Sequence, residues 1–371
     1  MGQIVAIYQY RRTCIMKISF AVKQVEYAKR TGNLNVEASG VVKSKKHFPY
    51  YRSENGTVEI FKPLSKTKPL TTPLFAFAEV FWSNVIDEYF MEAPRYQLAV
   101  CAGYSNEEPK YYDYGTLVPS VCDEGEHLVN LLEYYRNHPD PHVDIDNYIN
   151  YCMLFYDYTD IYESSVIQEN VKIGEELAMQ ILLSILKGDQ NYHYENVAFV
   201  CDEENNVLRL APVIDHEFST MFLFPEDLER NITFFRDLLS SIAGVETTED
   251  IKTKDEAERQ LLIQSTTNLN RNIRYISSQY PNVAASFLEK LEKFEKDIDD
   301  IRIYDEGYVF PCNSYSFKIG QARYKNYDEE QAIELEKTMR YYDIDLTVFE
   351  KVLKSEIEKV IKSLRKELER V

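Results

Sequence analysis

The sequence predicts an α+β protein with a β-rich N-terminal part and a helical C-terminal part. At 371 residues the chain is long enough for about two domains. Residues 57–63, TVEIFKP, alternate as a strand does, whereas residues 171–187, VKIGEELAMQILLSILK, place apolar side chains at helical spacing. Helical patterns dominate again from about residue 255 onward. We therefore assign residues 1–120 to a first lobe and residues 121–371 to a second.

The composition is that of a globular protein with an acidic surface. Hydrophobic residues make up 44% and charged residues 28% of the chain, which disfavours disordered and membrane-spanning classes. Asp and Glu total 61 against 42 Lys and Arg, and the net charge of -19 repels nucleic acid. The six cysteines have neither CxxC spacing nor a Cys/His cluster, so we expect reduced thiols and no zinc site. Without a secretory signal or a long apolar run, we expect a cytoplasmic protein with no direct nucleic-acid or membrane partner. Secretion as an effector stays open.

Two segments near the N-terminus carry weaker signals. Residues 3–36 contain β-like pieces that are compatible with an N-terminal strand pair. Residues 36–48, VEASGVVKSKKHF, place Ser39 and Gly40 ahead of lysines that include Lys45. A small-residue turn lets backbone amides approach phosphate oxygens, and nearby lysines neutralise them. An exposed hairpin explains the same residues equally well.

Lys62 ends the strand at residues 57–63, and the apolar helix LFAFAEVFWSNVID that follows contains Glu79. An unpaired buried carboxylate costs several kcal/mol, so Glu79 needs a cationic partner if that face is buried. Lys62 is the natural candidate for an ion pair. The alternative is that Lys62 is exposed to solvent and Glu79 lies on the wet side of its helix.

Residues 188–219, GDQNYHYENVAFVCDEENNVLRLAPVIDHEFS, carry the strongest chemical signal. A helix that stops at Lys187 leads into a polar loop, after which two apolar segments flank the turn DEENN and predict a hairpin. Asn196 precedes this hairpin and Asp215 follows it. Their amide and carboxylate oxygens are hard ligands of the kind that Mg²⁺ bound to phosphates uses.

The same stretch resembles the catalytic and metal-binding loops of HipA-like kinases, a bacterial branch of the protein-kinase-like fold that includes the HipA toxins and CtkA-type secreted kinases. Their pattern is G-x-x-D-x-H-x-x-N, a short hairpin, and L-A-P-x-x-D. The matching residues are Gly188, His193, Asn196, Leu210, Ala211, Pro212 and Asp215. The resemblance implies a bilobal protein-kinase-like fold that uses ATP and Mg²⁺, with Asn196 and Asp215 as metal ligands.

The resemblance also implies roles for residues of the first lobe. Residues Ser39, Gly40 and Lys45 fall at the family's phosphate loop. Lys62 and Glu79 correspond to the strand lysine and helix glutamate that hold the α- and β-phosphates in kinases. The hairpin expected over residues 95–122 leads to the place of the adenine-binding hinge, which would be formed by the segment carrying Val118 and Val121.

The family's catalytic aspartate falls on Asn191, an amide that cannot accept a proton from a hydroxyl at neutral pH. Asp189, two residues earlier, and Glu217, two residues after Asp215, are nearby carboxylates that could substitute as the base, whereas His193 is expected to brace the loop. Three hypotheses follow: a serine/threonine kinase of HipA-like type, acting as a toxin or effector and weakened at the base; a pseudokinase that binds nucleotide and acts through interactions; and a scaffold that binds no nucleotide. The protein substrate and any antitoxin-like partner stay unidentified.

Overall fold

The structure is a computed structural model in which the chain divides into two compact units that are each discontinuous in sequence. Residues 1–29, 48–119 and 290–355 form the first unit, and residues 30–47, 120–289 and 356–371 form the second. The division into a first lobe of residues 1–120 and a second lobe of residues 121–371 therefore stays a prediction. The structure describes residues 16–19, 23–26, 50–52, 58–63, 72–105, 108–143, 145, 159–189, 194, 196–214, 216, 270–305, 308–311, 316–319 and 342–371.

The first unit contains a five-stranded sheet in the order β2-β5-β6-β4-β3. Its strands are β2 (Lys23–Glu26), β3 (Tyr50–Arg52), β4 (Val58–Pro63), β5 (Gln97–Ser105) and β6 (Glu108–Pro119). The pair β2–β5 is parallel, and the other neighbours are antiparallel. The hairpin expected over residues 95–122 is confirmed by β5 and β6. In the β4–β6 register, Lys62 lies opposite Thr116.

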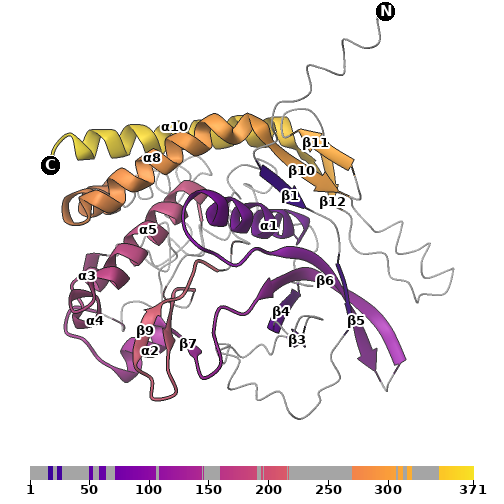
Figure 1. Ribbon diagram of the computed structural model, residues 1–371, viewed down its shortest axis with the longest axis horizontal. Coiled ribbons are helices and arrows are strands. Elements are labelled where there is room, and N and C mark those ends of the chain that lie inside the picture. The colour runs from indigo at the N-terminus through magenta and orange to yellow at the C-terminus, as the bar shows by residue number, and fades with distance from the viewer. Residues whose placement is uncertain are drawn as a thin grey trace, which may run out of the picture. The chain divides into compact units, whose positions relative to one another are not determined.

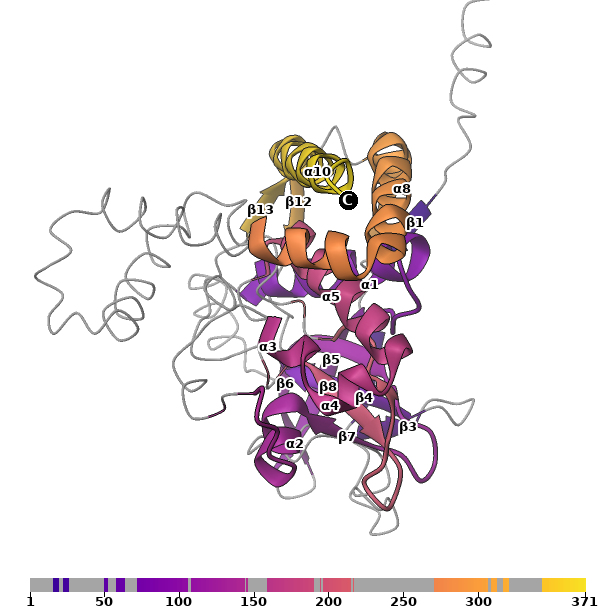
Figure 2. The same cartoon turned by 90° about the vertical axis from the view of Figure 1, so that its left-hand side faces the viewer.

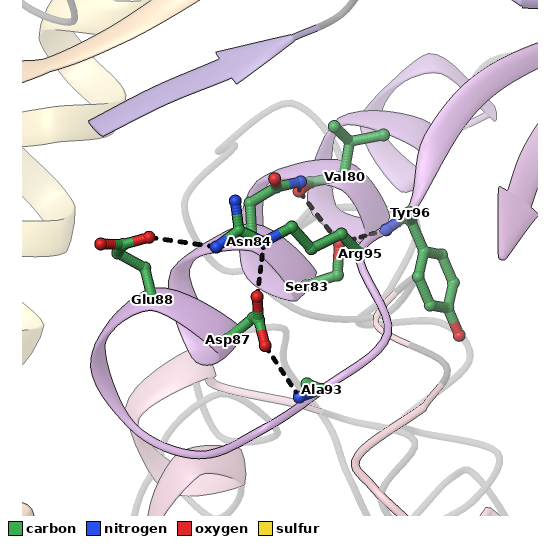
Figure 3. Close-up of polar contacts among 8 residues, drawn as sticks. All are labelled: Val80, Ser83, Asn84, Asp87, Glu88, Ala93, Arg95 and Tyr96. Carbon is green, nitrogen blue, oxygen red and sulfur yellow. Dashed lines mark hydrogen bonds and ion pairs between the residues drawn. The ribbon is translucent and has the colours of Figure 1, made fainter. Parts of the chain in front are cut away.

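Helix α1 (Thr72–Tyr89) forms the apolar centre of the first unit. It contacts β1, β5, β6 and β13, and Figure 1 shows it between β1 and the long β5–β6 pair. The segment that leads from α1 to β5 is fixed by polar side chains of the helix, as Figure 3 shows. Ser83 Oγ accepts a hydrogen bond from Tyr96 N at 2.9 Å, and Asp87 binds Arg95 at the surface. These contacts hold the residues that precede β5 against α1.

Further strands of the first unit join distant parts of the chain. They are β1 (Met16–Ser19), β10 (Ile301–Asp305), β11 (Tyr308–Pro311), β12 (Ser316–Ile319) and β13 (Tyr342–Asp345). Strand β1 pairs in parallel with β10, and β2 pairs with β5. The expectation of an N-terminal strand pair is thus wrong for these two strands, because each finds its partner far along the chain. The C-terminal part likewise contains strands as well as helices.

Two C-terminal helices run from one unit into the other. Helix α8 (Pro281–Asp297) begins with a proline, whose missing N–H costs nothing at a first helical position. It is followed by the 3-10 turn η4 (Ile298–Asp300), and the chain later ends in α10 (Leu346–Leu368). In the first unit, Phe294 of α8 packs against Tyr89, and Lys290 Nζ donates to Phe90 O at 2.6 Å. The end of α1 is therefore covered by α8.

The second unit has a three-stranded antiparallel sheet in the order β7-β8-β9 and several helices. Its elements are β7 (His127–Asn130), α2 (Leu131–Asn137), α3 (Thr159–Tyr162), α4 (Ser165–Gln168), α5 (Val171–Lys187), β8 (Ala198–Cys201) and β9 (Val207–Leu210), with further helical turns at residues 270–279. The predicted hairpin of β8 and β9 is confirmed. Figures 1 and 2 both show α2 beside this sheet.

The ends of α2 and α5 follow from capping residues. Asn130 Oδ1 accepts from Glu133 N at 2.7 Å, so α2 begins at Leu131, directly after strand β7. Helix α5 starts after Asn170 and ends at Gly188, which adopts a left-handed conformation with φ 59°. The predicted helix end at Lys187 is confirmed. In the part of the chain that the structure describes, no helix is long and apolar enough to cross a lipid bilayer.

Candidate functional site

Lys62 and Glu79 form an ion pair in the first unit. Lys62 Nζ lies 2.5 Å from Glu79 Oε1, and the two side chains are 16% and 0% exposed, respectively. Glu79 is buried because its neighbours on α1, including Ala78 and Val80, pack into the core. The ion pair expected from the sequence is therefore present, and it holds the partly exposed lysine ammonium against α1.

Val118 and Val121, the hinge candidates, lie in different units and are described separately. Val118 is buried in β6, where it faces Ile60 of β4. Val121 follows β6 and is half-buried, and its carbonyl oxygen accepts a hydrogen bond from Arg209 Nη2 at 3.0 Å. In this arrangement a side chain of β9 fixes the backbone of the Val121 segment.

Arg209 also binds Glu126 through both terminal nitrogens of its guanidinium group, Nη1 and Nη2. The Nη1–Oε1 and Nη2–Oε2 distances are 2.6 Å and 2.7 Å, a two-pronged contact that fits the planar groups on both sides. The hydrogen bonds from Arg209 lower the pKa of Glu126, and those to Glu126 raise the pKa of Arg209. Burial, followed by the negative charge of Glu126, raises the pKa of the adjacent Cys122 thiol to about 12. Arg209 thus connects β9 to Val121 and Glu126 in the segment after β6.

The turn that carries Asn196 is anchored to the first turn of α2. Leu131 N donates to Val197 O at 2.9 Å, and Leu132 N donates to Tyr194 O at 3.3 Å. The first N–H groups of a helix have no partner within the helix, so carbonyls of a neighbouring loop satisfy them. Asn196, half-buried, lies between these two anchored carbonyls in sequence.

The β8–β9 hairpin brings the segment after Asn196 beside the segment before Asp215. Ala211 N donates to Ala198 O at 2.8 Å. Because the strands are antiparallel, the residues that precede β8 and those that follow β9 leave the hairpin at the same end. Asn196 and Asp215 are neutral and anionic oxygen donors, a donor set that fits Mg²⁺, which needs few protein ligands because water and phosphates complete its octahedron. Asp215 itself lies outside the described residues.

A buried cluster of Lys187, Asp189 and His216 links the end of α5 to the residue after Asp215. Lys187 Nζ lies 2.7 Å from Asp189 Oδ2 and 3.0 Å from His216 Nδ1. The side chains of Lys187 and Asp189 are 0% and 1% exposed, and His216 is fully buried. Because an ammonium group only donates, the Nδ1 atom of His216 acts as acceptor. Asp189 is therefore an ion-pair partner inside the protein.

The site residues predicted from the sequence fall into three groups: those in the first unit, those in the second unit, and those outside the described residues. Lys62, Glu79 and Val118 belong to the first unit, and Val121, Asp189 and Asn196 belong to the second. The candidates that lie outside the described residues are Ser39, Gly40, Lys45, Asn191, His193 and Asp215. Their roles stay predictions.

Lys187 and His216 are not among the site residues predicted from the sequence. Lys187 looked like an ordinary basic residue in the last turn of a helix, a position where lysine is common. A signal was available, because Gln180 and Lys187 interrupt the apolar face of this helix at a spacing of two turns. Buried polar residues on an otherwise apolar helix must find partners, and here the partners follow β9.

Comparisons with known proteins show a distant similarity among the solved structures. No family model and no curated protein matches the chain. Among solved structures, the chain is similar to the proinflammatory kinase CtkA of Helicobacter pylori, with 11% identity and a TM-score of 0.40 over 92% of this chain and 98% of that one. A likeness at this level defines neither a family nor a function.

Proposed function

We propose that the protein binds ATP and Mg²⁺ and is a HipA-like serine/threonine protein kinase with weakened transfer activity. The Lys62–Glu79 ion pair carries this proposal. A strand lysine that is held by a buried helix glutamate at 2.5 Å has a defined position and remains 16% exposed, so it can meet a phosphate oxygen. Kinases use this combination of strand lysine and helix glutamate to hold the α- and β-phosphates.

The second support is the donor set near the β8–β9 hairpin. In the proposal, Asn196 and Asp215 hold Mg²⁺, and the hydrogen bonds from α2 to the carbonyls of Tyr194 and Val197 support the turn that carries Asn196. Bound Mg²⁺ would neutralise charge on the phosphates during transfer. The family motif over residues 188–215 supports the same roles.

The weakness of the proposed kinase lies at Asn191. A general base contributes roughly a hundredfold to ten-thousandfold to rate, and an amide cannot take that role. Because phosphoryl transfer depends mostly on positioning and charge neutralisation, slow transfer is expected to persist. The same residue favours a second candidate function, a pseudokinase that binds nucleotide and acts through a protein partner. A toxin or effector role belongs to the proposed kinase, and its protein substrate and any antitoxin-like partner stay unidentified.

Nucleotide binding is tested first, by thermal unfolding with ATP and MgCl₂. A ligand at a hundred times its dissociation constant stabilises the folded state by about 2.7 kcal/mol, so the wild-type transition should shift upward. Lys62→Met should remove the shift. Lys354→Met is the matched control, because this lysine also pairs with carboxylates, Asp299 and Glu350, but has no proposed role in binding. The absence of any shift in the wild-type protein at millimolar ATP would overturn the proposal.

Transfer is tested separately, by autophosphorylation with γ-labelled ATP. We expect Asn191→Asp to increase the rate about a hundredfold or more over the wild-type protein. Incorporation of label by Asn191→Asp but not by the wild-type protein favours the pseudokinase. If Asn191→Asp gains nothing while Asp189→Ala abolishes transfer without loss of nucleotide binding, Asp189 is the base and the assignment to position 191 is wrong.

A further inference from the structure

Helix α5 carries a row of three polar side chains on one face, Glu176, Gln180 and Lys187, which we name the α5 polar row. Gln180 and Lys187 are buried, and Glu176 is partly buried. At 3.6 residues per turn, the spacings of four and seven residues keep the three side chains within about 40° of arc. The row thus faces one neighbour rather than being scattered around the helix.

That neighbour is the segment that leaves β9. Glu176 Oε2 accepts from Leu210 N at 3.3 Å, and Gln180 Nε2 donates to Ala211 O at 2.7 Å. Lys187 Nζ donates to His216 Nδ1 at 3.0 Å. The order of the contacts along the helix is therefore the same as the order of their partners along the segment.

The lengths agree with a segment that runs beside the helix. The eleven residue-to-residue steps of α-helix from Glu176 to Lys187 span about 16 Å. The six steps from Leu210 to His216 span at most about 20 Å even in a fully extended chain. Helix α5 thus holds the chain at Leu210, Ala211 and His216.

Within the α5 polar row, burial of Lys187 carries the largest desolvation cost, because its side chain is charged. Its ammonium group is removed from water and is balanced by Asp189, which follows the left-handed turn at Gly188. A buried ion pair contributes less to stability than well-packed apolar residues often would, so stability alone gives little reason for a lysine here. A lysine does provide donors in two directions, one toward the loop after α5 and one toward His216.

We propose that Lys187 is a positioning residue that, through His216, holds the adjacent Asp215 in the orientation that Mg²⁺ binding requires. This inference rests on the proposed function, because it assigns Asp215 to the metal. Asp215 is covalently bonded to His216, whose ring accepts a hydrogen bond from Lys187, so we expect a change at Lys187 to reach the proposed metal ligand. Groups that orient metal ligands typically change metal affinity about 10- to 100-fold when they are removed.

The test measures the Mg²⁺ dependence of ATP binding by calorimetry, without any measurement of transfer. Lys187→Met should raise the MgCl₂ concentration needed for tight ATP binding about 10- to 100-fold. Its ATP affinity in EDTA should stay as in the wild-type protein. Lys290→Met is the matched control, since Lys290 also donates to a distant partner, Phe90 O, but lies in the first unit. The control should keep the wild-type Mg²⁺ dependence.

A second pair of variants keeps the inference testable if Lys187→Met fails to fold. His216→Asn retains an oxygen near the Nδ1 position that can accept from Lys187, whereas His216→Leu does not. We expect His216→Asn to bind ATP tightly at nearly the same MgCl₂ concentration as the wild-type protein. We expect His216→Leu to need a higher MgCl₂ concentration, as Lys187→Met does. Equal Mg²⁺ dependence in the wild-type protein, His216→Leu and His216→Asn overturns the inference and leaves nucleotide binding intact. A wild-type protein that binds no ATP with Mg²⁺ overturns the proposed function as well.

Discussion

The contact of Arg209 with Glu126 and Val121 allows a prediction whose magnitude can be worked from the structure. Arg209 donates to both Glu126 carboxylate oxygens at 2.6 and 2.7 Å and to Val121 O at 3.0 Å. Hydrogen bonds to charged groups contribute about 1.5–3 kcal/mol. The Arg209 side chain is 34% exposed, so solvent screening reduces this value. We expect Arg209→Met to lower the free energy of unfolding by about 1–2 kcal/mol.

The pH dependence of this contribution has a definite sign. Hydrogen bonds from Arg209 lower the pKa of Glu126 in the folded state, whereas the unfolded value is about 4.3. A lowered carboxyl pKa gives stability that is fully present above the unfolded pKa and is lost as the pH falls through the folded pKa. The stability difference between the wild-type protein and Glu126→Gln should therefore be largest near neutral pH and shrink below about pH 4.

The assay is urea unfolding of the wild-type protein, Arg209→Met, Glu126→Gln and the double variant at neutral and acid pH. The double-mutant cycle should give a coupling of about 1 kcal/mol at neutral pH. Arg95→Met with Asp87→Asn is the control cycle, because that ion pair has a 47% exposed arginine and should couple less strongly. A coupling near zero for Arg209 and Glu126, or one that persists unchanged into acid, would refute the reasoning.

Three further predictions concern single positions. Ser83→Ala removes the acceptor of the buried Tyr96 N–H, which lies 2.9 Å from Ser83 Oγ, and should cost about 1–3 kcal/mol in urea unfolding; no loss would contradict this contact. Gly174→Ala places a Cβ 2.5 Å from the Tyr280 hydroxyl oxygen, so it should destabilise by about 1–3 kcal/mol despite better helix propensity, and Tyr280→Phe should restore part of the loss. The Cys122 thiol, with a pKa of about 12, should react with iodoacetamide far more slowly in the folded than in the urea-unfolded protein at pH 8, as peptide mass spectrometry would show; equal rates would refute the pKa.

The parts of the fold that the sequence predicted are those determined by nearby residues. Helix α5 has an apolar face, an Asn at its N-cap and a Gly at its end. The β8–β9 hairpin has two apolar strands around a polar turn, in which Asn205 adopts φ 66°. The Lys62–Glu79 ion pair followed from a simple electrostatic requirement, since a carboxylate in an apolar helix needs a cation and the preceding strand supplied one.

The parts that the sequence could not predict depend on partners far along the chain. Strand β1 pairs with β10, which lies almost three hundred residues later, and no local pattern specifies such a partner. Strand β7 has only four residues, and its apolar positions continue into α2, so the whole segment fits a helical pattern. The cluster of Lys187 and His216 was missed for the same reason, because its members lie 29 residues apart and meet only through the packing of α5 on the segment after β9.

Asp189 and Asn191 lie two residues apart in the sequence, and we assign them different roles. A general base must come within hydrogen-bonding distance of the hydroxyl proton, directly or through one water. The Asp189 carboxylate is 1% exposed and lies 2.7 Å from the Lys187 ammonium, so that ion pair would have to break before the carboxylate could accept a proton. The exposed fraction and the ion pair both favour a positioning role for Asp189. In the proposed kinase, Asn191 occupies the base position, so the groups proposed to hold phosphate and Mg²⁺ have no nearby proton acceptor. Such a protein is expected to bind ATP much better than it transfers phosphate, and this imbalance distinguishes it from a fully active kinase and from a scaffold that binds no nucleotide.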